Sequence, residues 1–322
     1  MAGLSRRTKR WAALGIALLA IAGISIFVLR RDRLFDPSFD TSVSNPAYSG
    51  ARPRVLYDEG HRNTHAADAA YKPFVDLLRN DGYEVQVLRE PLTPDRLSGA
   101  NTLVIVCARG ANDANDEPAF TDAEITAVDH WVRAGGSLLL VTDHWPYGSA
   151  AQSLSKSFEI DMSGGFLQDP KHFEQSLGDS HLVFTRENGL VRDHPITQGR
   201  SAAEAVQRII TFTGQSLHGP SHAVPFLNLA DSAVDRPPTT PHVERDGGDI
   251  RVSMSYGEPT PAVGRAAALA LEVDKGRVVV LGESGMLRAN RDSRGFCVGM
   301  NFPGYENRQL ALNIMHWLSR LF

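Results

Sequence analysis

Three apolar runs of this chain end in side chains that can do acid–base chemistry. Each run has the composition of a buried strand, and the residues that follow it are carboxylic acids and histidines. Such groups, once brought together, can polarise a water molecule, bind a divalent metal or hold a polar ligand. The candidate site residues are Asp58, Glu59, His61, Asp143, His144 and Glu283, with Ser284 and His65 close by in the sequence.

A divalent metal is one open alternative for this set. His61, Asp143 and His144 are the residues that would ligate it, because imidazole nitrogens and carboxylate oxygens are common protein ligands of such cations. The sequence contains no compact ligand signature such as H-E-x-x-H, so the residue types alone indicate no particular metal.

Structural roles are equally open for each of these residues. Asp58 and Glu59 can cap the helix that is predicted to follow them, because a carboxylate stabilises the positive end of a helix dipole. His144 can be a hydrogen-bonded histidine beside Trp145. Glu283 can simply accept hydrogen bonds from loop amides.

Alternating strand and helix patterns position these side chains. Apolar runs predict strands over residues 54–57, 83–88, 102–106 and 137–142, and amphipathic patterns predict helices from 66 to 79 and from 93 to 97. Thr121 and Glu124 form a capping box that opens a third helix. This order predicts an α/β fold with a doubly wound, mainly parallel sheet and helices on both faces. Strand ends then meet at one edge of the sheet, where ligands bind in such folds.

The second half of the chain is less regular. Residues 160–250 are rich in His, Pro, Asp and Gly, and they indicate an irregular insertion. Regular patterns return as a β-hairpin over 267–273 and 276–281 and as a final helix over 306–321. We therefore expect one α/β domain over residues 54–322.

The N-terminal segment has the composition of a membrane anchor. Residues 11–29 contain no charged side chain, and a helix of about 19 residues spans roughly 28 Å, close to a bilayer core. Arginines follow the apolar run at once and no small-x-small cleavage site precedes them, which favours an uncleaved transmembrane helix over a secretion signal. Residues 30–53 indicate a linker.

Charge on the two sides of this segment gives an orientation. Residues 1–10 carry four basic side chains, which favours a cytoplasmic N-terminus and an extracytoplasmic soluble domain, periplasmic in a Gram-negative cell. The expected contacts of the chain are therefore membrane lipid through residues 11–29 and a protein partner in a membrane complex.

Composition excludes several classes of function. The net charge of −4 and the absence of a basic cluster beyond the N-terminus argue against nucleic acid as a partner. Two cysteines, Cys107 and Cys297, cannot provide a disulfide framework, and Cys107 at the end of an apolar run indicates a buried structural thiol. The sequence contains neither a GxGxxG nor a CxxC motif, and this argues against a redox protein.

Several motifs, taken in order, resemble a known family. They occupy residues 57–61, 120–124, 134–141, 193–197 and 276–284. In this order they resemble the class I glutamine amidotransferase-like fold, which is flavodoxin-like. The similar branch is that of domains of unknown function in bacterial membrane proteins, including auxiliary components of gliding-motility-type ABC transporters.

The chain differs from that family at the positions of the family's catalytic residues. Amidotransferases of this fold carry a nucleophilic cysteine on the turn after a central strand, but the matching turn here, residues 142–146, contains no thiol. The late His-Pro-Glu segment is absent as well. Glutamine hydrolysis therefore has no nucleophile, and the expected function is a non-catalytic domain that binds a ligand or partner. The alternative is a hydrolase that uses the Asp/Glu/His cluster, possible substrates being a glycan or an amide.

Overall fold

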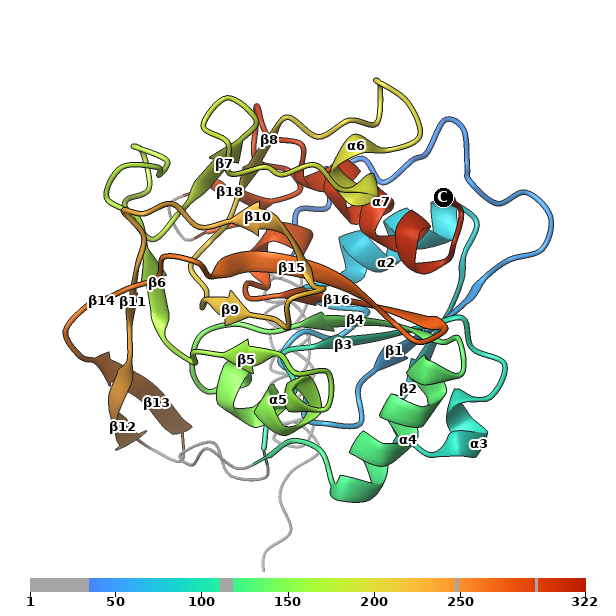
Figure 1. Ribbon diagram of the computed structural model, residues 1–322, viewed down its shortest axis with the longest axis horizontal. Helices are drawn as coiled ribbons and strands as arrows, with labels where there is room; N and C mark the ends of the chain where they lie inside the picture. Colours follow the sequence, from blue (N-terminus) through green and yellow to red (C-terminus); the bar gives the residue numbers. More distant parts are fainter. Residues whose placement is uncertain (1–34, 111–117, 247–248, 293–294) are drawn as a thin grey trace, which may run out of the picture.

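The computed structural model describes residues 35–110, 118–246, 249–292 and 295–322. A nine-stranded sheet crosses the centre of the molecule, and its strand order is β2-β1-β3-β4-β16-β15-β9-β5 with β10 added beside β15 (Figure 1). The α/β class expected from the sequence is confirmed.

One half of this sheet is parallel. Its five strands pair in parallel register from β2 to β16. Both faces of β3 and β4 are buried along their whole length, which explains their unbroken apolar sequences. The strands are β1 (Arg54–Asp58), β2 (Glu84–Leu88), β3 (Thr102–Val106), β4 (Ser137–Val141) and β16 (Gly276–Leu281).

The other half is antiparallel, so the sheet is mixed rather than mainly parallel. The reversal occurs between β15 and β16, which a two-residue turn at Asp274 and Lys275 connects. So short a connection can join only antiparallel neighbours, because a parallel pair needs a crossover of a dozen or more residues. The strands of this half are β15 (Ala266–Val273), β10 (Val224–Asn228), β9 (Leu217–His218) and β5 (Asp161–Met162).

Helices cover both faces of the sheet, as Figure 1 shows. Alternate strand residues point to opposite sides, so Val104 belongs to one hydrophobic core and its neighbour Ile105 to the other. Helices α2 (Lys72–Asn80) and α7 (Asn307–Leu318) pack in the first core. Helices α3 (Pro94–Leu97), α4 (Asp122–Arg133) and α5 (Tyr147–Lys156) pack in the second.

Helix α2 begins later than the apolar pattern predicted. Residues 67–71 form turns, and the helix opens at Lys72 with Pro73 in its first turn. Proline is tolerated there because its missing N–H would have no helical acceptor in any case.

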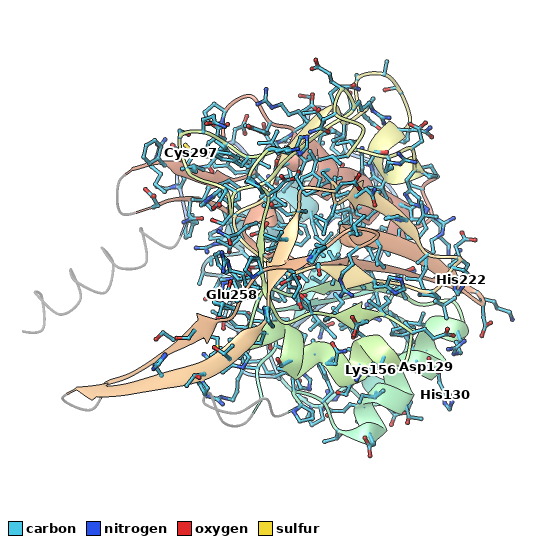
Figure 2. The ribbon with its side chains drawn as sticks, turned by 60° about the vertical axis from the view of Figure 1, so that its left-hand side comes forward. Asp129, His130, Lys156, His222, Glu258 and Cys297 are labelled. Carbon is cyan, nitrogen blue, oxygen red and sulfur yellow. The ribbon has the colours of Figure 1, made fainter. Side chains whose placement is uncertain are left out.

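Smaller sheets occupy the region from β5 to β14 and the segment before α7. In Figure 2 the β12–β13 hairpin projects away from the body of the molecule. The remaining elements are β6 (Phe166–Gln168), β7 (Val183–Thr185), α6 (Pro195–Gln198), β8 (Arg208–Ile210), β11 (Val234–Arg236), β12 (Pro238–Asp246), β13 (Asp249–Tyr256), β14 (Thr260–Pro261), η1 (Gly285–Leu287), β17 (Ala289–Arg291) and β18 (Cys297–Gly299).

The membrane prediction needs correction. The helix expected at residues 11–29 lies outside the described residues, and within the described ranges no helix is long and apolar enough to cross a bilayer. The longest helices there, α4 and α7, have 12 residues each. At about 1.5 Å per residue they extend roughly 18 Å, against a hydrocarbon core about 30 Å thick. On this finding the prediction of a single-pass membrane protein is wrong for the described part of the chain.

Candidate functional site

The predicted site residues divide into two groups along the carboxyl edge of the parallel strands. In the first group, His61 lies between two carboxylates. Its Nδ1 is 2.8 Å from Oδ1 of Asp58 at the end of β1, and its Nε2 is 3.0 Å from Oε1 of Glu124 in α4. All three side chains are buried.

The sequence revealed the capping box of Glu124 but not that this residue is a partner of His61. Its Oε2 accepts hydrogen bonds from the backbone N–H and the hydroxyl of Thr121, as the motif predicts. Its Oε1 also accepts from the backbone N–H of Leu92, next to the contact with His61. Burial alone would raise the pKa of Glu124, but these hydrogen bonds lower it to about 2.

The same contacts favour the charged form of His61. Burial disfavours the imidazolium, yet hydrogen bonds and charge attraction from Asp58 and Glu124 outweigh it and raise the pKa of His61 above its ordinary value. Both ring nitrogens are occupied, so neither can bind a metal or take a proton from a substrate. This group is a buried ionic clamp that joins the end of β1 to the start of α4.

Glu59 makes structural contacts next to this clamp. Its Oε1 accepts a hydrogen bond of 2.8 Å from the backbone N–H of Ala67, and its Oε2 lies 2.8 Å from Nη2 of Arg89. The carboxylate therefore fixes the loop between β1 and α2.

The second group lies at the ends of β4 and β16. Oδ2 of Asp143 accepts hydrogen bonds from the hydroxyl of Ser284 at 2.7 Å and from its backbone N–H at 3.2 Å. Oδ1 of Asp143 accepts from the backbone N–H of His144 at 2.9 Å. The carboxylate stands on the turn after β4 and ties the ends of two adjacent strands together.

Glu283 lies directly beside this pair and is also engaged. Its carboxylate accepts hydrogen bonds from the backbone N–H groups of Gly285 and Met286. Burial, followed by the negative charge of Asp143, raises the pKa of Glu283 well above its ordinary value. Two carboxyl groups so close together disfavour full ionisation of both.

His144 turns towards the base of the projecting hairpin. Its Nδ1 lies 2.9 Å from the carbonyl oxygen of Trp145 and 3.1 Å from the hydroxyl of Tyr256 in β13. Its Nε2 is 3.5 Å from Oδ1 of Asp143. The three metal candidates therefore do not converge: His61 belongs to the first group, whereas Asp143 and His144 belong to the second. Among the residues that the structure describes, no group of three or more His, Cys, Asp or Glu side chains has the arrangement of a metal site.

Two further residues join the second group. Nε2 of His65 is 3.3 Å from the hydroxyl of Ser284, and burial lowers the pKa of this histidine to about 3. Cys107 follows β3 with a left-handed φ of 45° and is fully buried. Burial and the charge of Asp143 raise the pKa of its thiol well above the ordinary value, so it is not a nucleophile at neutral pH. The sequence placed His65 near the candidate residues and indicated that Cys107 is a buried thiol, but it gave no sign that Ser284 would contact His65.

The order of these contacts differs from that of a catalytic triad. A triad places the histidine between the nucleophile and the carboxylate, so that it can take the proton of the nucleophile. Here Ser284 lies between His65 and Asp143, and its hydroxyl donates to the carboxylate. Asp143 and Ser284 are both buried.

Comparison with known proteins gives the fold. No family model and no curated protein matches the chain. Among solved structures, the mmIFT52 N-terminal domain is 15% identical, with a TM-score of 0.57 over 82% of this chain and 97% of that one. A ThuA-like protein from Bacteroides uniformis is 13% identical, with a TM-score of 0.38 over 88% of this chain and 94% of that one. The first likeness shows that this chain shares the α/β fold of that domain.

Proposed function

We propose that this chain is a non-catalytic, amidotransferase-like domain that binds a ligand or a protein partner. The observation that carries the proposal is the state of Asp143. Its carboxylate stands on the turn after β4, and both of its oxygens accept hydrogen bonds from the protein itself. Because the carboxylate of Asp143 holds strand ends together, it is not available to attack a carbonyl carbon.

The alternative is a hydrolase at the same edge of the sheet. The observation that favours it is the 3.3 Å contact between Nε2 of His65 and the hydroxyl of Ser284, which is a base beside an alcohol. A movement that released Ser284 from Asp143 would give the histidine access to the hydroxyl proton.

An assay of turnover separates the two functions. Purified full-length protein is incubated with glutamine, a simple ester, an aryl amide and an aryl glycoside, next to the Ser284→Ala variant. If the chain is a non-catalytic binding domain, wild type and variant should release product at the same background rate. Turnover by the wild type that Ser284→Ala abolishes, at an unchanged melting temperature, would establish the hydrolase instead.

A genetic measurement tests the same point in the cell. In a strain that lacks the gene, Asp143→Asn and Ser284→Ala should restore the wild-type phenotype as long as the variants remain folded. Loss of complementation by a folded variant contradicts a purely structural role for these residues.

The resemblance to domains of bacterial membrane proteins indicates which partners to test first. Auxiliary components of gliding-motility-type ABC transporters work within a protein complex, and we extend this to the present chain as a proposal. Co-purification of tagged full-length protein with any protein encoded beside its gene, followed by reconstitution from purified proteins, is the direct measurement.

A further inference from the structure

We propose that a second site, on the opposite part of the sheet from the Asp143 group, binds a small organic monocarboxylate with an apolar body. The site is a pocket of about 460 Å³ between β15, β16, the start of α6 and the end of α7. Its volume lies in the range of about 300–1,000 Å³ that is typical of small-molecule sites. Aliphatic and aromatic side chains form most of its wall, and the polar lining residues are His194, His222, Glu272 and Arg277.

His194 offers the first hydrogen-bond donor. The ring is nine-tenths buried, and it packs edge-on against Trp317 with 5.1 Å between ring centroids. Its Nδ1 accepts a hydrogen bond from the backbone N–H of Ile196 at the start of α6, so the neutral ring carries its proton on Nε2. No residue of the described chain accepts a hydrogen bond from that Nε2.

Burial and the charge of Arg277 keep His194 in this state. They lower the pKa of the imidazole to about 4, so the ring is neutral at physiological pH. A neutral histidine with a fixed tautomer presents one N–H to a ligand, and this N–H requires an acceptor atom.

Arg277 offers the second donor and the positive charge. Its guanidinium stacks over the ring of Trp317 at 4.7 Å, and Nη1 donates to the backbone oxygens of Trp317 and Phe322. These contacts hold the group in one orientation. Nη2 has no acceptor among the described residues, so the pocket contains two donor N–H groups, one on His194 and one on Arg277, to which no described residue is bonded.

The charge balance selects a monoanion. Glu272 lies 3.3 Å from Nε of Arg277, and its side chain is 67% exposed at the rim. It offsets part of the positive charge, so a dianion such as a phosphate monoester would meet repulsion there. One carboxylate can accept from Nη2 of Arg277 and from Nε2 of His194, while an aromatic or branched aliphatic body contacts the apolar wall.

This inference goes beyond the proposed function and does not depend on it, because none of the pocket residues belongs to the Asp143 group. Binding of hydrocinnamate to the full-length protein tests it by calorimetry and by NMR of histidine nitrogens. We expect saturable binding that shifts the Nε2 signal of His194. The neutral analogue hydrocinnamamide and the dianion phenyl phosphate should each bind at least about tenfold more weakly.

Three variants identify the residues responsible. Arg277→Gln should weaken hydrocinnamate binding about tenfold or more, and His194→Asn should weaken it severalfold while retaining a side-chain acceptor for α6. Glu272→Gln changes an exposed side chain, so it should fold normally and bind more tightly. The matched control is Arg96→Gln, which removes the same charge from an exposed site on α3, on the other face of the sheet, and should change affinity less than about twofold.

Four results would overturn the proposal. They are a lack of saturable hydrocinnamate binding by the wild type, equal affinity for the acid and its amide, preference for phenyl phosphate, and binding that Glu272→Gln leaves unchanged. Turnover in the assays of the previous section would refute the non-catalytic function and leave this test unaffected.

Discussion

At the scale of single residues, the clearest feature is a buried histidine, His61, whose charged form is favoured by two carboxylates. His61 bonds Asp58 three residues before it and Glu124 in α4. Removal of one partner from a buried ionic contact leaves the other groups without compensation, and this loss outweighs what the contact itself contributes.

The clamp predicts a defined dependence of stability on pH. The pKa of His61 is higher in the folded than in the unfolded chain, whose value is about 6.5. Its contribution is therefore complete below pH 6.5 and is lost as pH rises through the higher folded value. The free energy of unfolding in urea should fall over this interval in the wild type, and the fall should be absent in His61→Gln.

A matched control shows whether the effect belongs to the clamp. His130 is exposed on α4, where Figure 2 labels it, and His130→Gln removes a histidine from the same helix. The control should retain the wild-type pH profile, whereas His61→Gln should also lose about 1–3 kcal/mol at pH 6. Identical profiles for wild type and His61→Gln would show that His61 is not charged in the folded protein.

At the scale of elements, the contact of α4 with the turn between β15 and β16 depends on a glycine. A Cβ atom on Gly276 would meet the carbonyl oxygens of Val132 and Gly136, the latter at 2.6 Å. The end of α4 thus approaches β16 more closely than any side chain allows. This contact connects the parallel half of the sheet to the hairpin that begins the antiparallel half.

Substitution of this glycine tests the contact. Gly276→Ala should destabilise the fold by about 1–3 kcal/mol, because backbone atoms on two sides cannot move away independently. The comparison is Gly50→Ala, where a Cβ has no neighbour within 4 Å. Urea unfolding of both variants measures the difference, and equal stabilities would mean that the helix end shifts at little cost.

At the scale of the whole molecule, the segment before the first strand belongs to the folded body. Residues predicted as a linker make contacts with the core: Phe39, Val43 and Tyr48 pack against it. The hydroxyl of Tyr48 is 2.7 Å from that of Ser319 after α7, and the backbone N–H of Ala47 donates to Asp81 after α2. The segment therefore fastens α2 and α7 to each other from outside.

Two chain lengths test this arrangement. A protein that begins at Phe35 keeps these contacts, and one that begins at Arg54 loses them. We expect the shorter protein to be less stable by at least about 2 kcal/mol, since burial of one large apolar side chain contributes about 1.5–3 kcal/mol. Thermal melting of both proteins gives the comparison, and equal melting temperatures would show that residues 35–53 contribute nothing to the fold.

The sequence by itself determined the features that depend on near neighbours. Strand and helix positions follow from apolar periodicity, and the box of Thr121 and Glu124 opens α4 as its spacing predicted. The placement of acidic and histidine residues at strand ends was visible for the same reason, because the end of an apolar run marks the end of a strand.

Tertiary structure decided which of these residues meet. Glu124 reaches His61 across 63 positions because the start of α4 lies next to the loop that follows β1. Asp143 reaches Ser284 across 141 positions because β16 lies next to β4 in the sheet. The pocket of His194, Arg277 and Trp317 likewise combines α6, β16 and α7. Local patterns contain the period of each element but not the order of strands, and that order is fixed by how all the apolar faces are buried together.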